Sequence, residues 1–244
     1  MTRRRTSLLL GASLIGVSCG NGDGDTTLVL AASSLTDVFT EMESAFEEAN
    51  PGTDIEMSFA ASSSLRLQID EGAPADVVAV ANDDVMTGLA GEGHVTAATV
   101  FATNRLVVVA PADGSVPVLG ADSLSDPTLL VGLCAVQVPC GRYAGDALAL
   151  AGIEPSVDTY ENDVRSLTTK LVIGELDVGV IYATDAASRP NDLLVVAPLD
   201  GADVEYPIAP LTDAPHAEEA AAFIDFVLSP AGRSILDAAG FGAP

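Results

Sequence analysis

The sequence has no tryptophan, one lysine, two histidines and three cysteines, so positive charge and metal-binding side chains are both scarce. Ten basic residues stand against 35 acidic ones, which gives a formal net charge of −25. Cleavage before Cys19 would bring the charge to −28, because it would remove Arg3, Arg4 and Arg5 and no acid. A surface this acidic repels phosphate backbones, which excludes nucleic-acid binding.

Several enzyme signatures are also missing. The chain has no G-x-S-x-G elbow, no P-loop and no G-x-G-x-x-G segment after a predicted strand. His94 and His216 stand in loop-like contexts and far from the cysteines, so we expect no cation site and no cofactor. No apolar run is long enough to span a bilayer. The 48% hydrophobic content argues against disorder and predicts a globular domain.

The N-terminus has the pattern of an export signal. Arg3–Arg5 precede the apolar stretch Ser7–Val17, which matches the charged and hydrophobic regions of a secretory signal peptide. The Gly16–Cys19 segment resembles a bacterial lipoprotein cleavage site, and Gly and Asp residues follow it. We therefore predict a signal peptide at 1–18, lipidation of Cys19 and a flexible tether at 19–25. Ordinary cleavage nearby, with Cys19 removed or left free, is the alternative.

The other two cysteines are close in sequence. Export would place Cys134 and Cys140 in an oxidising compartment, where we expect them to form a disulfide.

The hydrophobic pattern alternates between short apolar runs and amphipathic stretches. This order predicts an α/β protein built of right-handed βαβ units, with helices on both faces of the sheet. Predicted strands lie at 26–32, 54–60, 75–80, 105–110, 129–135, 178–182, 193–197 and 204–209. Predicted helices begin at Ser34, Ser62, Asp83, Pro139, Val164 and Ala217, the last being broken near Ser229 and Pro230.

Four of these helix starts share one chemical feature. Small or hydroxyl residues begin the helices near Ser34, Ser62 and Cys140, and Asp163 precedes a fourth. A helix N-terminus offers free backbone N–H groups and a partial positive charge, so several of them around one point would bind an anion. For each serine taken alone an ordinary helix cap is the better interpretation, and the spacing does not show whether the starts converge.

Motifs along the chain resemble those of one family. The chain from Thr26 to Gly242 is similar to the molybdate-binding proteins of ATP-driven oxyanion importers, which have the two-lobed type II periplasmic-binding-protein fold. The motifs that carry the resemblance are Ala31–Thr36, Ser58–Leu65, Glu71–Val77, Leu106–Pro111, Val138–Tyr143, Asp163–Arg165, Gly179–Tyr182 and Glu205–Ile208.

The resemblance implies a fold and a ligand set. It implies two lobes, each a mainly parallel sheet flanked by helices: lobe 1 at 26–107 plus 208–244 and lobe 2 at 108–207. By motif match, molybdate or tungstate would be held by Ser34 and Ser62 through hydroxyl and amide, by the amides of Cys140 and Val164, and by the Tyr182 hydroxyl. The family has a small apolar residue where Cys140 stands, and any residue of Ser62–Ser64 could face the ligand.

The resemblance also implies a biological setting. It implies a monomeric, non-enzymatic binding protein, exported, lipid-anchored at Cys19 outside the cytoplasmic membrane, with an ABC permease and its ATPase as partners. Molybdenum would be present only within the bound oxyanion. Three alternatives remain: the same fold with another oxyanion such as sulfate, thiosulfate or phosphate; an exported thiol enzyme that uses Cys134 or Cys140; and a surface sensory module that binds an oxyanion without transport.

Overall fold

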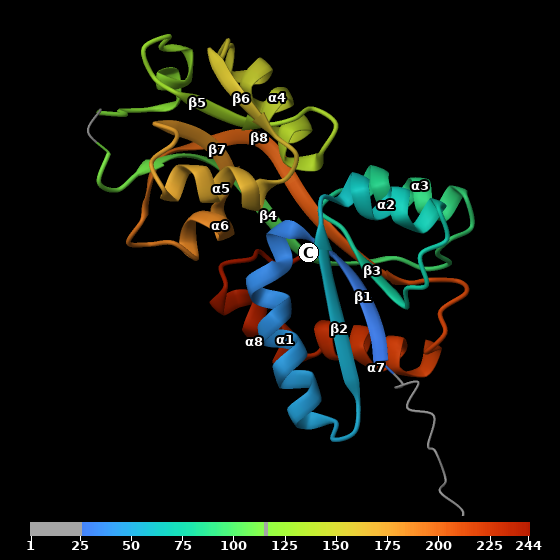
Figure 1. Ribbon diagram of the computed structural model, residues 1–244. Coiled ribbons are helices and arrows are strands. Elements are labelled where there is room, and N and C mark those ends of the chain that lie inside the picture. Colours follow the sequence, from blue (N-terminus) through green and yellow to red (C-terminus); the bar gives the residue numbers. More distant parts are fainter. Residues whose placement is uncertain (1–25, 115–116) are drawn as a thin grey trace, which may run out of the picture.

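The computed structural model describes residues 26–114 and 117–244, and Figure 1 shows their arrangement. The predicted signal peptide, tether and lipidation site at Cys19 lie outside the described residues. Within the described residues, no helix is both long enough and apolar enough to cross a membrane.

The chain alternates strands and helices as the sequence predicts. The elements up to the middle of the chain are β1 (Thr26–Ala32), the 3-10 helix η1 (Ser33–Leu35), α1 (Thr36–Ala49), β2 (Asp54–Ala60), α2 (Ser62–Asp70), β3 (Val77–Ala79), α3 (Asp83–Gly91), β4 (Thr99–Pro111) and the 3-10 helix η2 (Ala121–Ser125). They are followed by β5 (Val131–Cys134), α4 (Pro139–Ala151), β6 (Val157–Glu161), α5 (Val164–Val172), β7 (Val178–Tyr182), α6 (Ala183–Ala187), β8 (Leu193–Pro210), α7 (Ala217–Leu228) and α8 (Pro230–Ala238).

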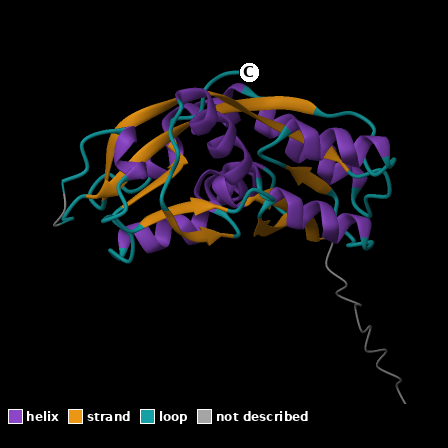
Figure 2. Cartoon of the chain, turned by 90° about the horizontal axis from the view of Figure 1, so that it is seen from above, coloured by secondary structure: helices purple, strands orange, loops and turns teal. Residues whose placement is uncertain are grey.

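One eight-stranded sheet, in the order β2-β1-β3-β8-β4-β7-β5-β6, runs through the molecule. We call β1–β3 with α1–α3, α7 and α8 the first half, and β5–β7 with α4–α6 the second half. Pairing within each half is parallel. The long strands β4 and β8 are antiparallel to each other, and they join the two halves. Figure 2 shows the resulting elongated outline. The α/β fold class predicted from the sequence is confirmed.

The two joining strands pair with each other along their length, and each pairs on its other edge with a different half. β8 pairs with β3 through Ile208–Pro210, whereas β4 pairs with β7 through Leu106–Val109. Between these points the β4–β8 register shifts: Arg105 faces Asp203, whereas the next residue, Leu106, faces Leu199. The predicted lobe boundaries, at 107/108 and 207/208, lie near these changes and stay a prediction.

Helices cover both faces of the first half, as the period of two along its strands requires. Val29 and Ala31 of β1 join the large core under α1, α7 and α8, whereas Leu30 between them joins a second core. That second core contains Leu65 of α2 and Leu89 of α3. A strand that is buried on both faces reads as the continuous apolar run seen in the sequence.

The structure differs from the sequence expectation in three places. The strands predicted at 193–197 and 204–209 are one strand, β8, which continues through the register shift. β6 is an edge strand whose residues alternate between half-buried and exposed, so it lacks the apolar run that identifies the other strands. The short helix α6 follows β7 without a break, and no turn signal separates them.

Two glycines of α4 test how closely this helix packs. A Cβ on Gly141 would collide with the backbone carbonyls of Cys134 and Ala135, whereas a Cβ on Gly145 would meet nothing within 4 Å. We expect Gly141→Ala to lower the free energy of unfolding by about 1–3 kcal/mol through overpacking. Gly145→Ala should raise it by about 0.5–1 kcal/mol through helix propensity. Urea denaturation measures both, and equal effects would contradict the close approach at Gly141.

Candidate functional site

Four helix starts converge on one small cavity between the two halves. The first half contributes the starts of η1 and α2, and the second half contributes the starts of α4 and α5. All five residues predicted to bind a ligand line this cavity. The complete lining is Ala32, Ser33, Ser34, Ala61, Ser62, Ala81, Val138, Pro139, Cys140, Asp163, Val164 and Tyr182. Its volume of about 10 Å³ is on the scale of one water molecule, so the two halves stand close together around it.

Ser34 is oriented by a hydrogen-bond chain from β4 and β8. The Asn104 amide nitrogen donates to the Thr184 hydroxyl at 2.8 Å and lies 3.4 Å from the Tyr206 hydroxyl, to which it also donates. The Tyr206 hydroxyl in turn donates to Ser34 Oγ at 3.0 Å. Since Ser34 Oγ accepts a hydrogen bond from the Tyr206 hydroxyl, its own O–H is directed elsewhere, and the open side is the cavity. Tyr206 and Asn104 were not identified from the sequence; their signal is a polar group within a buried apolar strand.

Ser62 is the member of the serine triplet that faces the cavity. It is 1% exposed, and its Oγ accepts a hydrogen bond from the Ala81 backbone N–H at 3.0 Å. Ser63 and Ser64 do not line the cavity. The interpretation of Ser34 and Ser62 as ordinary helix caps is wrong, because neither side chain accepts from the first turn of its helix.

The second half presents backbone amides. Pro139 occupies the first position of α4, where its missing N–H costs nothing, and the helix's first hydrogen bond is donated by Gly141. The Cys140 N–H therefore precedes the bonded turn. At α5, Asp163 caps the helix by accepting from the N–H and the hydroxyl of Ser166, both at 2.8 Å, and the Val164 N–H stays outside the bonded turn.

A disulfide fixes the start of α4. Cys134 at the end of β5 is bonded to Cys140, as predicted, with their Cα atoms 5.7 Å apart. The bond ties the helix start to the sheet and occupies both sulfur atoms. A thiol nucleophile at either position is therefore absent from the described structure.

The Tyr182 hydroxyl is a hydrogen-bond donor at the cavity with no acceptor among the described residues. Its side chain is 1% exposed, and its hydroxyl is buried without a hydrogen-bond partner among the described residues. Burial holds the pKa of this phenol well above its usual range, so the O–H stays protonated and can only be satisfied by an acceptor. An unpaired buried hydroxyl costs about 1–3 kcal/mol, and a ligand oxygen in the cavity would remove that cost.

The cavity contains no cationic side chain, and nearby acids are neutralised or engaged. The two oxygens of Asp163 are taken up by Ser166. Asp185 of α6 is 4% exposed, and burial raises its pKa to about 8, so it is protonated at neutral pH. The cavity thus presents neutral donors, and the one acidic side chain on its lining, Asp163, is hydrogen-bonded to Ser166; such a donor set suits an acceptor-only anion.

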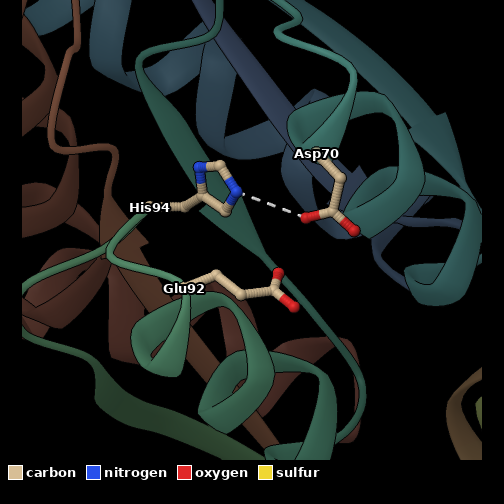
Figure 3. A group of neighbouring side chains, drawn as sticks. All are labelled: Asp70, Glu92 and His94. Carbon is tan, nitrogen blue, oxygen red and sulfur yellow. Dashed lines mark ion pairs between the residues drawn. The ribbon is translucent and has the colours of Figure 1, made fainter.

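A second polar cluster lies on the surface of the first half, away from the cavity. Asp70, Glu92 and His94 point toward one another, with His94 Nε2 3.3 Å from the Asp70 carboxylate (Figure 3). Their spacing would suit a cation, but the Arg66 guanidinium already pairs with Glu92 at 2.6 Å and with Asp70 at 3.6 Å. We therefore interpret the cluster as a surface ion-pair network.

Comparisons with known proteins agree on a class. A family model described as bacterial extracellular solute-binding protein matches residues 27–242. The molybdate-binding protein ModA of Mycobacterium tuberculosis is 34% identical over 220 residues, which cover 89% of this chain and 84% of the relative. A putative ABC transporter substrate-binding lipoprotein of Bacillus subtilis, YvgL, is 27% identical over 96% of this chain and 95% of its own.

A solved structure shares the fold but has a different ligand in its name. The sulfate-binding protein SubI of Mycobacterium tuberculosis superposes with a TM-score of 0.76 at 18% identity, over 88% of this chain and 86% of SubI. At this identity the likeness concerns the fold alone.

The buried carboxyl of Asp185 predicts a pH dependence of stability. Its folded-state pKa of about 8 lies above the ordinary aspartate pKa of 3.8, so between these limits the folded chain holds a proton that the unfolded chain has released. Stability should therefore fall as pH rises from 5 to 8. We expect Asp185→Asn to reduce that fall by about 1–3 kcal/mol in urea denaturation. Asp225→Asn, at an exposed position of α7, is the control; an unchanged fall in Asp185→Asn would contradict the buried neutral acid.

Proposed function

The chain belongs to the bacterial extracellular solute-binding proteins, and on this premise we propose that it captures molybdate, and equally tungstate, between its two halves. The oxyanion would accept hydrogen bonds from the hydroxyls and amides of Ser34 and Ser62, from the amides of Cys140 and Val164, and from the Tyr182 hydroxyl. The relative at 34% identity is a molybdate-binding protein, which supports this choice of ligand.

One observation carries the proposal: three hydroxyls from both halves, of which Ser62 and Tyr182 are buried and Ser34 is half-buried, donate to no acceptor among the described residues at the same cavity. Tyr182 has no partner among the described residues, and the Ser34 and Ser62 oxygens are already accepting from Tyr206 and Ala81. A fully deprotonated dianion has only acceptors and would satisfy all three. Hydrogen bonds to a charged partner contribute about 1.5–3 kcal/mol each, so a set of neutral donors can offset the desolvation of the ion.

The donor set also favours some oxyanions over others. A protonated phosphate carries an O–H that needs an acceptor, and each oxygen of Asp163, the carboxylate on the lining, already accepts one hydrogen bond from Ser166. Sulfate is a dianion too, so it stays the main alternative ligand. SubI, a sulfate-binding protein, has the same fold, which is consistent with this alternative. Molybdate and tungstate present the same charge and nearly the same size, and we expect both to bind.

The proposed setting is transport at the cell surface. The loaded protein would deliver its ligand to an ABC permease driven by an ATPase; the similarity to YvgL, a putative ABC transporter substrate-binding lipoprotein, supports this setting. We propose export by the N-terminal signal, anchoring through a lipid on Cys19, and a monomeric state. Catalysis is not part of the proposal, because the two cysteines of a thiol-enzyme alternative are joined in a disulfide.

Capture would be coupled to a hinge motion. β4 and β8 join the halves, and the cavity is lined from both sides. Rotation about these strands would open the cavity for entry, and a bound anion would favour the closed state because only closure brings both sets of donors onto it. A permease could then distinguish the loaded closed form from the open one.

Removal of single hydroxyls tests the assignment. We expect Ser34→Ala, Ser62→Ala and Tyr182→Phe each to weaken molybdate binding by about 1–3 kcal/mol, because each removes a donor to a charged partner. Titration calorimetry of the purified, ligand-stripped protein measures the change. Ser64→Ala is the matched control, since this serine lies on the same helix but does not line the cavity. Wild-type affinity in all three variants would overturn the ligand set.

A further inference from the structure

Two arginines in the motifs that resemble those of the molybdate-binding proteins are not among the proposed ligand donors. Arg142 lies in the first turn of α4, two residues after Cys140, and Arg165 follows Val164 at the start of α5. Both belong to the second half, and both flank a helix start that presents an amide to the cavity. They are two of only seven basic residues that follow Arg5 in a strongly acidic chain.

Each arginine forms an ion pair across the boundary between the halves. Arg165 binds Asp37 of α1 with two hydrogen bonds, of 2.8 and 2.6 Å. Arg142 pairs with Asp84 of α3. The partners are 128 and 58 residues apart, and both acids belong to the first half. Figure 1 shows α5 beside the upper end of α1, and α4 above α3.

The two pairs lie on opposite sides of the ligand cavity. A cavity of about 120 Å³ contains Arg66, Asp84 and Arg142 and shares Val138 and Pro139 with the ligand cavity. On the other side, a cavity of about 150 Å³ contains Asp37 and Asp185 and shares Ser34 with it. Both flanking cavities are lined by residues of the two halves, so they follow the boundary that opens when the halves separate.

The local chemistry holds both arginines in place. The Arg142 guanidinium lies over the Tyr143 ring, 5.4 Å from its centroid, and its Nε is buried without a hydrogen-bond partner among the described residues. At the other pair, the hydrogen bonds from Arg165 lower the pKa of Asp37, and Asp37 raises the pKa of Arg165. Asp37 is therefore ionised at neutral pH, and the pair is a true ion pair.

We propose that Arg142 and Arg165 steer the oxyanion into the open cleft and then latch the closed cleft by pairing with Asp84 and Asp37. The steering role rests on the proposed function, whereas the latch needs no ligand. When the halves separate, the pairs break and the second half exposes two positive charges beside the α4 and α5 helix starts. These charges counteract, at the entrance, the repulsion that the acidic chain exerts on an anion. Closure then returns each arginine to its acid.

The kinetics of molybdate binding separate the two roles. Stopped-flow tyrosine fluorescence can follow binding, because the chain has no tryptophan and Tyr182 lies at the site. We expect Arg142→Gln and Arg165→Gln to lower the association rate about two- to fivefold and to raise the dissociation rate by a similar factor. Asp37→Asn and Asp84→Asn should raise the dissociation rate alike, but they should leave association unchanged or faster.

Lys170→Gln is the matched control, because Lys170 pairs with Glu161 inside the second half on the same helix as Arg165. It removes the same charge without touching the boundary, and its rates should stay near those of the wild type. The slower association of the arginine variants should disappear at about 1 M salt, where the Debye length falls to about 3 Å. Arginine variants with the same rates as Lys170→Gln would overturn the proposal.

A ligand-free measurement distinguishes failure of the latch from failure of the proposed ligand. Small-angle X-ray scattering should show a larger radius of gyration for the Asp37→Asn, Asp84→Asn double variant than for Lys170→Gln. Equal radii would overturn the latch whatever the wild type binds. A larger radius in a protein that binds no molybdate would keep the latch and reject the proposed function together with steering.

Discussion

The described structure depends on one constraint: several hydrogen-bond donors are buried or half-buried around a single point, and no described residue accepts from them. Tyr182 is the plainest case, because its hydroxyl is fully enclosed and unpaired. The groups around the cavity are engaged in a way that leaves these donors available. Tyr206 and Ala81 donate to the oxygens of Ser34 and Ser62, Ser166 donates to Asp163, and burial keeps Asp185 protonated. Such a site stores unfavourable free energy that an acceptor-only ligand releases on binding.

The topology explains how that free energy becomes a conformational signal. The donors are divided between two halves that β4 and β8 join, and no single half contains the whole set. An oxyanion therefore gains its full complement of hydrogen bonds only in the closed arrangement. The acidity of the chain sets a second requirement, because long-range repulsion opposes anion capture. The few cations that flank the cleft acquire importance for that reason, although ion pairs at an exposed boundary contribute little to stability by themselves.

Much of this could be predicted from the sequence. Apolar runs identified the buried strands, and the serine-rich helix starts pointed to Ser34 and Ser62, because period and capping chemistry are local properties. Convergence of the four starts is a long-range property, and only the resemblance to a family implied it. The sequence did not identify Asn104, Tyr206 or Asp185. These polar residues lie within apolar strands or in a helix with no turn before it, and their roles come from contacts that are distant in sequence. The edge strand β6 was missed because it lacks an apolar face.

The central claim is that neutral donors select a fully deprotonated tetrahedral dianion. Its most direct test is titration calorimetry of the wild-type protein, stripped of ligand, with molybdate, tungstate, sulfate and phosphate at physiological salt. We predict tight one-to-one binding of molybdate and tungstate, with sulfate and phosphate far weaker. Preferred binding of sulfate would keep the donor site and change the ligand. Binding of phosphate in preference to the dianions, or no heat from any of the four in a folded sample, would contradict the account.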